Sequence, residues 1–227
     1  MIPHFEYAHP NHVMGENKIK VLPKPMGDRR ELVYISIPKN ASTWIKRHLV
    51  PHRDSNYYVE PVGKHQLVFT CLRDPVERWA TGLAQYVVGN RPDSPMHIDN
   101  LDWDMVMDRV VFDNHTQPQT DFVANLDHSE MTWFWCDSMF AARFFDFAHD
   151  LGLALQPIEN TANNHFNITK HQPAVWLESN RYMAPPQQLI LDKIKCKLAD
   201  NSKYNTRLQQ FYKSDYKLIE NTRFYGT

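Results

Sequence analysis

The chain has 227 residues, the length of one domain, and its 42% hydrophobic and 12% aromatic residues exclude wholesale disorder. Its 25 basic residues nearly balance its 26 acidic residues, which leaves a formal net charge of -1. This balance excludes a broadly basic chain, so we expect no nucleic-acid partner and no membrane-surface partner. An anionic ligand would need a local positive pocket.

The N-terminal part predicts one strand followed by one helix. Residues 1–30 carry no regular pattern and are expected to be irregular. Residues 32–37 form an almost continuous apolar run, which predicts a strand buried on both faces. Residues 42–50 are predicted to form a helix that Ser42 or Thr43 caps.

A second unit of the same kind follows. Residues 67–72 predict another buried strand that ends at Arg73, and Pro75 suits the first turn of a helix that continues over 76–88. Two strand-then-helix units in succession indicate an α/β fold with a mainly parallel central sheet flanked by helices. We expect residues 1–227 to form a single domain.

The later part of the chain continues the alternation less clearly. Residues 131–136 predict a third strand, and Ser138 is expected to cap a helix that ends at Gly152. After Pro186, an apolar residue at every fourth position predicts a further helix. Residues 204–219 are expected to be helical in places.

The cysteines and the N-terminal residues indicate the cellular compartment in which the protein is expected to work. Cys71, Cys136 and Cys196 are a poor disulfide framework and favour a reducing compartment. None lies in a CxxC pair and no cluster of metal-ligating residues is visible, so we expect no metal. The first 20 residues are polar, and no apolar run of 18 residues occurs elsewhere, so we expect no signal peptide, no membrane anchor and a cytoplasmic location.

The first segment that carries chemistry is Pro-Lys-Asn-Ala-Ser-Thr-Trp at residues 38–44, where the first strand meets its helix. Backbone N–H groups at a helix start bind phosphate or sulfate, the hydroxyls of Ser42 and Thr43 add donors, and Lys39 adds a positive charge. The alternative is a plain turn with a helix cap. The paired glycines of the Walker A motif are absent, which disfavours an ATP- or GTP-using enzyme of that kind.

The second segment is Arg-Asp-Pro-Val-Glu-Arg at residues 73–78. Arg73 falls at the carboxyl end of a predicted strand, where open α/β sheets bind ligands. Its planar guanidinium suits a bidentate grip on phosphate. The alternative for this segment is a capped helix with surface charges.

Together the two segments resemble the sulfotransferases that use 3′-phosphoadenosine-5′-phosphosulfate (PAPS). Residues 38–44 are similar to that family's 5′-phosphosulfate loop, and residues 73–78 to its 3′-phosphate segment. In the family a serine stands eight residues after the first arginine, whereas here that position is Thr81. The resemblance implies a P-loop-like sulfotransferase fold with PAPS as the sulfuryl donor and no metal.

Two further stretches resemble the carbohydrate sulfotransferase branch of this family. They are His-Thr-Gln-Pro-Gln at residues 115–119 and Phe-Tyr-Lys-Ser-Asp-Tyr-Lys-Leu at residues 211–218. The resemblance therefore implies a hydroxyl acceptor on a sugar or a glycan. The sequence leaves open two alternatives, a non-catalytic nucleotide-binding protein on a sulfotransferase scaffold and an ATP-using kinase-like enzyme.

The resemblance also implies a role for each matching residue. Lys39 would contact the oxygen that bridges phosphate and sulfate, Trp44 would lie against the adenine, and Arg73 with Thr81 would hold the 3′-phosphate. The 5′-phosphate would be held through Asn40, Ala41, Ser42 and Thr43. For Trp44, a core aromatic is the alternative.

The general base stays open among His52, Glu60, His65 and His115. We place His65 and His115 first, then Glu60, then His52, because His65 stands just before the second strand and His115 opens the His-x-x-Pro-Gln stretch. The start of a strand lies away from the carboxyl-end cleft, which counts against His65 unless the strand begins later.

Overall fold

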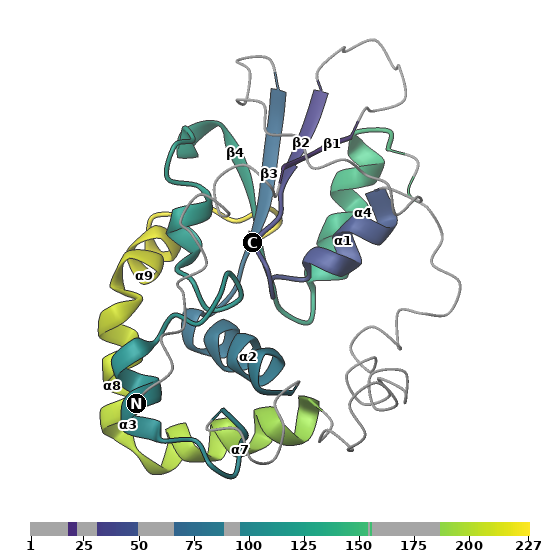
Figure 1. Cartoon of the computed structure of the whole chain (residues 1–227). Coiled ribbons are helices and arrows are strands. Elements are labelled where there is room, and N and C mark those ends of the chain that lie inside the picture. Colours follow the sequence, from purple (N-terminus) through teal and green to yellow (C-terminus); the bar gives the residue numbers. More distant parts are fainter. Residues whose placement is uncertain (1–17, 22–30, 50–65, 89–95, 154, 156–186) are drawn as a thin grey trace. The chain divides into compact units, whose positions relative to one another are not determined.

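The computed structural model describes residues 18–21, 31–49, 66–88, 96–153, 155 and 187–227 (Figure 1). These residues divide into two compact units. The first contains a β-sheet with the helices that pack on it, and the second is a group of helices.

The first unit is built on a four-stranded sheet with the order β1-β2-β3-β4. Its strands are β1 (Lys18–Val21), β2 (Glu31–Ile35), β3 (Gln66–Leu72) and β4 (Met131–Trp135). Strands β2, β3 and β4 are parallel, and β1 pairs antiparallel with β2. Three parallel strands with flanking helices confirm the predicted α/β class, and the three predicted strands lie where they were expected.

Strand β1 corrects the expectation that residues 1–30 are irregular. Its register runs from Lys18 opposite Ile35 to Val21 opposite Leu32. Lysine and aliphatic residues alternate over this stretch, which is the period of a strand, but four residues are a weak signal by themselves. The edge of β2 supplies the partner that makes this short segment a strand.

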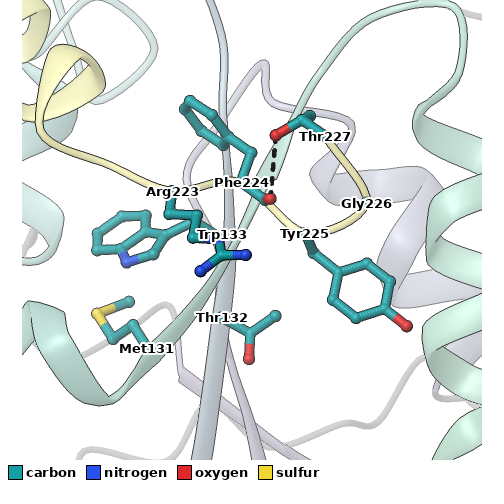
Figure 2. Close-up of a pocket in the computed structure, with 8 residues that line it drawn as sticks. All are labelled: Met131, Thr132, Trp133, Arg223, Phe224, Tyr225, Gly226 and Thr227. Atoms are coloured by element: carbon teal, nitrogen blue, oxygen red, sulfur yellow. Dashed lines mark hydrogen bonds between the residues drawn. The ribbon is translucent and has the colours of Figure 1, made fainter.

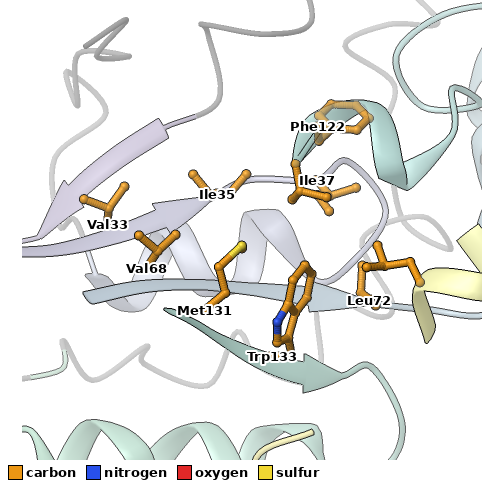
Figure 3. Close-up of a cluster of buried hydrophobic side chains, with 10 residues drawn as sticks. Val33, Ile35, Ile37, Val68, Leu72, Phe122, Met131 and Trp133 are labelled. Atoms are coloured by element: carbon orange, nitrogen blue, oxygen red, sulfur yellow. The ribbon is translucent and has the colours of Figure 1, made fainter. Parts of the chain in front are cut away.

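Apolar side chains of the parallel strands lie on both faces of the sheet, as the continuous apolar runs predict. The 3-10 helix η2 (Gln119–Phe122) and helix α9 (Lys213–Glu220) contribute Phe122 and Leu218 to the core on one face. Figure 3 shows the strand residues of this cluster, which include Val33, Ile35, Val68, Leu72, Met131 and Trp133.

The opposite face carries an aromatic cluster. Helices α1 (Ser42–Leu49) and α4 (Phe140–Asp150) pack there against the strands. Its buried members include Leu32, Tyr34, Trp44, Phe69, Phe134, Phe140, Phe144 and Phe147. The sheet is therefore enclosed by apolar side chains on both sides, and its polar ends remain for other contacts.

Helix α4 begins later than expected and ends as expected. Its N-cap is Met139 rather than the predicted Ser138, and no side chain caps this end. At the other end, Gly152 has a φ of 64° and the N–H of Leu153 returns to the carbonyl of Ala148 at 2.8 Å. This is the Schellman geometry that favours glycine after a helix.

The second unit consists of α2 (Pro75–Val88), α3 (Trp103–Arg109), α7 (Gln187–Asp200) and α8 (Ser202–Phe211). Helix α2 packs against α7 and α8, and α3 packs against α8. Trp79 of α2 is fully buried and donates its indole N–H to the carbonyl of Val110 at 2.8 Å. The short helix η3 (His128–Glu130) belongs to the first unit.

We expect Phe134→Ala to lower the free energy of unfolding by about 3–5 kcal/mol, because this fully buried ring leaves a cavity in the aromatic cluster. Phe145→Ala is the matched control, since that ring on α4 is 44% exposed. The control should cost only about 1 kcal/mol. Urea unfolding followed by circular dichroism measures both variants, and equal losses would contradict the assigned core.

Candidate functional site

The loop between β2 and α1 holds two non-glycine residues in the left-handed backbone region. Lys39 has a φ of 69° and Ala41 a φ of 55°. Such a conformation costs about 1–3 kcal/mol for a non-glycine residue, so other contacts must hold it. A backbone that alternates into this region turns successive N–H groups toward one concave side, and such concavities bind anions. The first N–H groups of α1 have no acceptor within the helix and add to this site.

Asn40, the residue between them, fastens the loop to the end of β3. It is fully buried. Its Nδ2 donates to the carbonyl of Cys71 at 2.7 Å and to Oε1 of Gln119 at 2.6 Å. Its backbone N–H donates to the carbonyl of Ile37 at 3.3 Å. The strained backbone is therefore held by a buried side chain with partners on two other segments.

Arg73 brings the second predicted segment to the same place. It follows β3 directly, and its guanidinium donates to the carbonyl of Lys39 at 3.4 Å. Its backbone N–H donates to Oε1 of Gln119 at 3.1 Å, and its carbonyl accepts from Nε2 of Gln119 at 2.9 Å. Lys39 and Arg73, which lie 34 positions apart in sequence, therefore meet at the carboxyl ends of β2 and β3.

The site depends on Gln119 and Asp215, which the sequence did not predict as site residues. The fully buried carboxylate of Asp215 accepts the backbone N–H groups of Gln119 at 2.8 Å and of Thr120 at 2.9 Å. Gln119 belongs to the stretch 115–119 and Asp215 to the stretch 211–218. The resemblance of these two stretches to known motifs was the only sequence signal for the two residues. The fold joins the two stretches as hydrogen-bond partners.

Trp44 lies in the core. Its ring is 6% exposed and packs edge-on against Phe140 and Phe144, with centroids 5.5 Å away in both cases. His48 and Phe145 lie on it at 4.1 Å and 5.6 Å. These contacts favour the core-aromatic alternative, because an adenine on this ring would have to displace its neighbours.

Thr81 lies on α2, in the second unit. Its hydroxyl donates to the carbonyl of Glu77 at 2.9 Å, one helical turn earlier, and its own carbonyl accepts from Nε2 of Gln187 at 3.3 Å. Because the Thr81 hydroxyl donates its hydrogen to a carbonyl of its own helix, in this conformation it can accept a hydrogen bond from a ligand but cannot donate one.

His115 also belongs to the second unit, where Asp113 orients it. The Asp113 carboxylate accepts the backbone N–H of His115 at 2.8 Å and lies 2.8 Å from its Nδ1. Arg78 donates to the carbonyl of Asn114 at 3.1 Å, which fixes the same turn against α2. Gly82 allows this approach, because a Cβ there would collide with the carbonyl of His115. An imidazole held at Nδ1 by a carboxylate can accept a proton at Nε2.

His52, Glu60 and His65 lie outside the described residues. Strand β3 begins at Gln66, so the later strand start that would favour His65 is not observed. Within the described part of the chain, no group of three or more His, Cys, Asp or Glu side chains is arranged to hold a metal ion. No helix in that part has the length and apolar character to cross a bilayer.

A separate shallow pocket lies beside β4. It is lined by Met131 to Trp133 and by the C-terminal residues from Arg223 to Thr227 (Figure 2). The N–H of Tyr225 donates to the carbonyl of Trp133 at 2.8 Å, so the C-terminal segment extends the edge of β4. None of the predicted site residues lines this pocket.

No protein-family model, no curated protein and no solved structure matches this chain.

We expect Gln119→Met to lower the free energy of unfolding by about 2–4 kcal/mol, because it leaves buried polar groups of Asn40 and Arg73 without their partner at nearly constant volume. The matched control is Gln188→Met on α7, whose side-chain bond to Asp192 is exposed. The control should change stability by less than about 0.5 kcal/mol. Equal losses in urea unfolding would contradict a structural role for Gln119.

Proposed function

We propose that this chain is a PAPS-dependent sulfotransferase, which moves a sulfuryl group from PAPS to a hydroxyl acceptor on a P-loop-like sulfotransferase fold. The observation that carries the proposal is the hydrogen bond between Arg73 and the left-handed residue Lys39 at the carboxyl ends of β2 and β3. It brings together the two segments that resemble the family's two phosphate-binding motifs. Open α/β sheets bind ligands at this edge.

The loop and the start of α1 supply donors for the 5′-phosphate. The concave backbone around Asn40 and Ala41 and the first turn of α1 suit an anion. Ser42 is partly exposed and Thr43 is exposed, and the proposal assigns both hydroxyls to the ligand. Because Asn40 is tethered by buried bonds, these donors are organised before a ligand arrives, which is the arrangement that stabilises developing charge.

Lys39 is suited to stabilise the negative charge that develops on the departing phosphate. In the proposed reaction the acceptor oxygen bonds to sulfur, and the bond from sulfur to the bridging phosphate oxygen breaks with its electron pair left on the phosphate. The charge that develops there needs a nearby cation, and a lysine on the phosphate loop provides one. The donor is already activated, so positioning and charge stabilisation are the main tasks.

Arg73 is suited to bind the 3′-phosphate through its guanidinium group. A guanidinium has five N–H donors, so its bond to the Lys39 carbonyl is compatible with a bidentate grip on phosphate. Thr81 is assigned to the same phosphate by the resemblance alone. Trp44 has no part in the proposal, because it is buried among other rings.

His115 is proposed as a candidate for the general base on the resemblance alone, because it belongs to the second unit whereas Lys39 and Arg73 belong to the first. Within its own unit Asp113 contacts its Nδ1, an arrangement that favours Nε2 as the proton acceptor. His65, Glu60 and His52 stay predictions from the sequence. The acceptor is proposed to be a sugar or glycan hydroxyl, and the location to be cytoplasmic, since all three cysteines are free thiols.

We expect Lys39→Ala to lower sulfuryl transfer by about a hundred- to a thousandfold while affinity for 3′-phosphoadenosine-5′-phosphate falls less than about tenfold, because the ammonium acts mainly on the departing phosphate. Transfer of labelled sulfate from PAPS to a panel of sugar acceptors measures the first quantity, and calorimetry the second. Lys217→Ala, an exposed cation on α9, is the control. Comparable transfer by wild type and Lys39→Ala would refute the assigned role.

We expect Arg73→Ala to weaken binding of 3′-phosphoadenosine-5′-phosphate by about 10–100-fold and to leave AMP binding nearly unchanged, because a charged hydrogen bond contributes about 1.5–3 kcal/mol. Arg223→Ala, an exposed arginine of the same unit, is the control. Equal losses for the two nucleotides would remove the 3′-phosphate assignment.

If ATP rather than 3′-phosphoadenosine-5′-phosphate stabilises the wild type in thermal shift, the kinase-like alternative is correct.

A further inference from the structure

The carboxyl end of β3 extends past the end of its neighbour β2. Strand β2 ends at Ile35, whereas β3 continues to Leu72. The Leu72 carbonyl accepts the N–H of Cys136 at 2.8 Å, so it faces β4. Because the backbone groups of successive residues in a strand point to opposite sides, those of Cys71 and Arg73 face the other side, where β2 has already ended.

Two side-chain amides take the place of the missing strand on that side. Nδ2 of Asn40 donates to the Cys71 carbonyl at 2.7 Å, and Oε1 of Gln119 accepts the Arg73 N–H at 3.1 Å. The two amides are joined, because Nδ2 of Asn40 also donates to Oε1 of Gln119 at 2.6 Å. Nε2 of Gln119 donates in turn to the Arg73 carbonyl at 2.9 Å. The pair of amides therefore continues the hydrogen-bond ladder of the sheet beyond β2.

The single amide group of Gln119 thus contacts both halves of the candidate anion site. One bond reaches Asn40 in the loop at residues 38–43, and two bonds reach the backbone of Arg73. The backbone N–H of Gln119 is itself held by the Asp215 carboxylate at 2.8 Å. Asn40, Gln119 and Asp215 are all fully buried, so water is not at hand to replace a bond that breaks.

We propose that Gln119 is a positioning residue that couples the two halves of the site and so selects nucleotides that carry two separate phosphates. The identity of these phosphates rests on the proposed function, whereas the coupling between the loop and Arg73 does not. A phosphate that orders Arg73 also orders the amide bonded to it, and through that amide Asn40. Binding of one phosphate therefore prepares the other half, and the effect is equal in both directions.

The selectivity is tested by calorimetry with AMP and with 3′-phosphoadenosine-5′-phosphate. In Gln119→Met we expect the ratio of the AMP dissociation constant to that of 3′-phosphoadenosine-5′-phosphate to fall about tenfold, because the second phosphate no longer gains from the first. Phe147→Ala is the control of comparable instability, since that ring is buried in the aromatic cluster, and it should keep the ratio of the wild type. An equal loss of affinity for both nucleotides in Gln119→Met would show a purely structural role and overturn the proposal.

A second measurement uses the wild-type protein alone. The Arg73 N–H is bonded to Gln119, so its hydrogen exchange reports on that bond. AMP has no 3′-phosphate for Arg73, yet the coupling predicts that AMP slows exchange of the Arg73 N–H as well as exchange in the loop at residues 38–43. Exchange is followed residue by residue by nuclear magnetic resonance. Slower exchange in the loop with no change at Arg73 would contradict the coupling.

The proposed function and the coupling fail in different ways. If neither nucleotide binds the wild type, the proposed function is refuted, and exchange in the unliganded proteins still decides the coupling. There we expect Gln119→Met to speed exchange at Arg73 and at residues 38–43 together, about tenfold more than Phe147→Ala does. If Gln119→Met does not fold, Asp215→Asn replaces it, because it weakens the hold on the Gln119 backbone. Faster exchange in only one of the two segments, or the same increase in the control, would overturn the inference.

Discussion

The buried amide of Gln119 is the interaction on which the candidate site depends. It accepts from Asn40 and from the backbone of Arg73, donates to the Arg73 carbonyl, and is itself held through its backbone by Asp215. Every group in this set is polar and most are buried, so the loss of any one partner leaves a buried polar group unsatisfied at a high cost. Four segments of the chain are thereby required to meet at one point, which sets the spacing between the Lys39 loop and Arg73.

This constraint explains how a strained loop persists without glycine. Lys39 and Ala41 keep left-handed conformations that are unfavourable for both residue types, and the tether through Asn40 offsets that cost. Helix α1 is anchored behind the loop by Trp44 in the aromatic cluster.

Part of the candidate site was predictable because its residues follow strand ends directly. Lys39 and Arg73 each come just after an apolar run, and parallel strands bring such positions to one edge. Gln119 and Asp215 were not assigned because their partners lie 79 and 96 positions away. For Trp44 the sequence left two alternatives, a contact with adenine and a core aromatic, and the packing of Phe140 and Phe144 of helix α4 on its ring favours the second.

The sequence by itself determined the α/β class, the three parallel strands, and the placement of most helices, because hydrophobic period and helix-start signals are local properties. It also located the two segments that resemble phosphate-binding motifs. Only the tertiary structure decided that Lys18–Val21 is a strand, that Lys39 and Ala41 are left-handed, and that Gln119 joins Asn40 to Arg73. Each of these depends on a hydrogen bond or a packing contact between distant positions, and no local pattern encodes such a pairing.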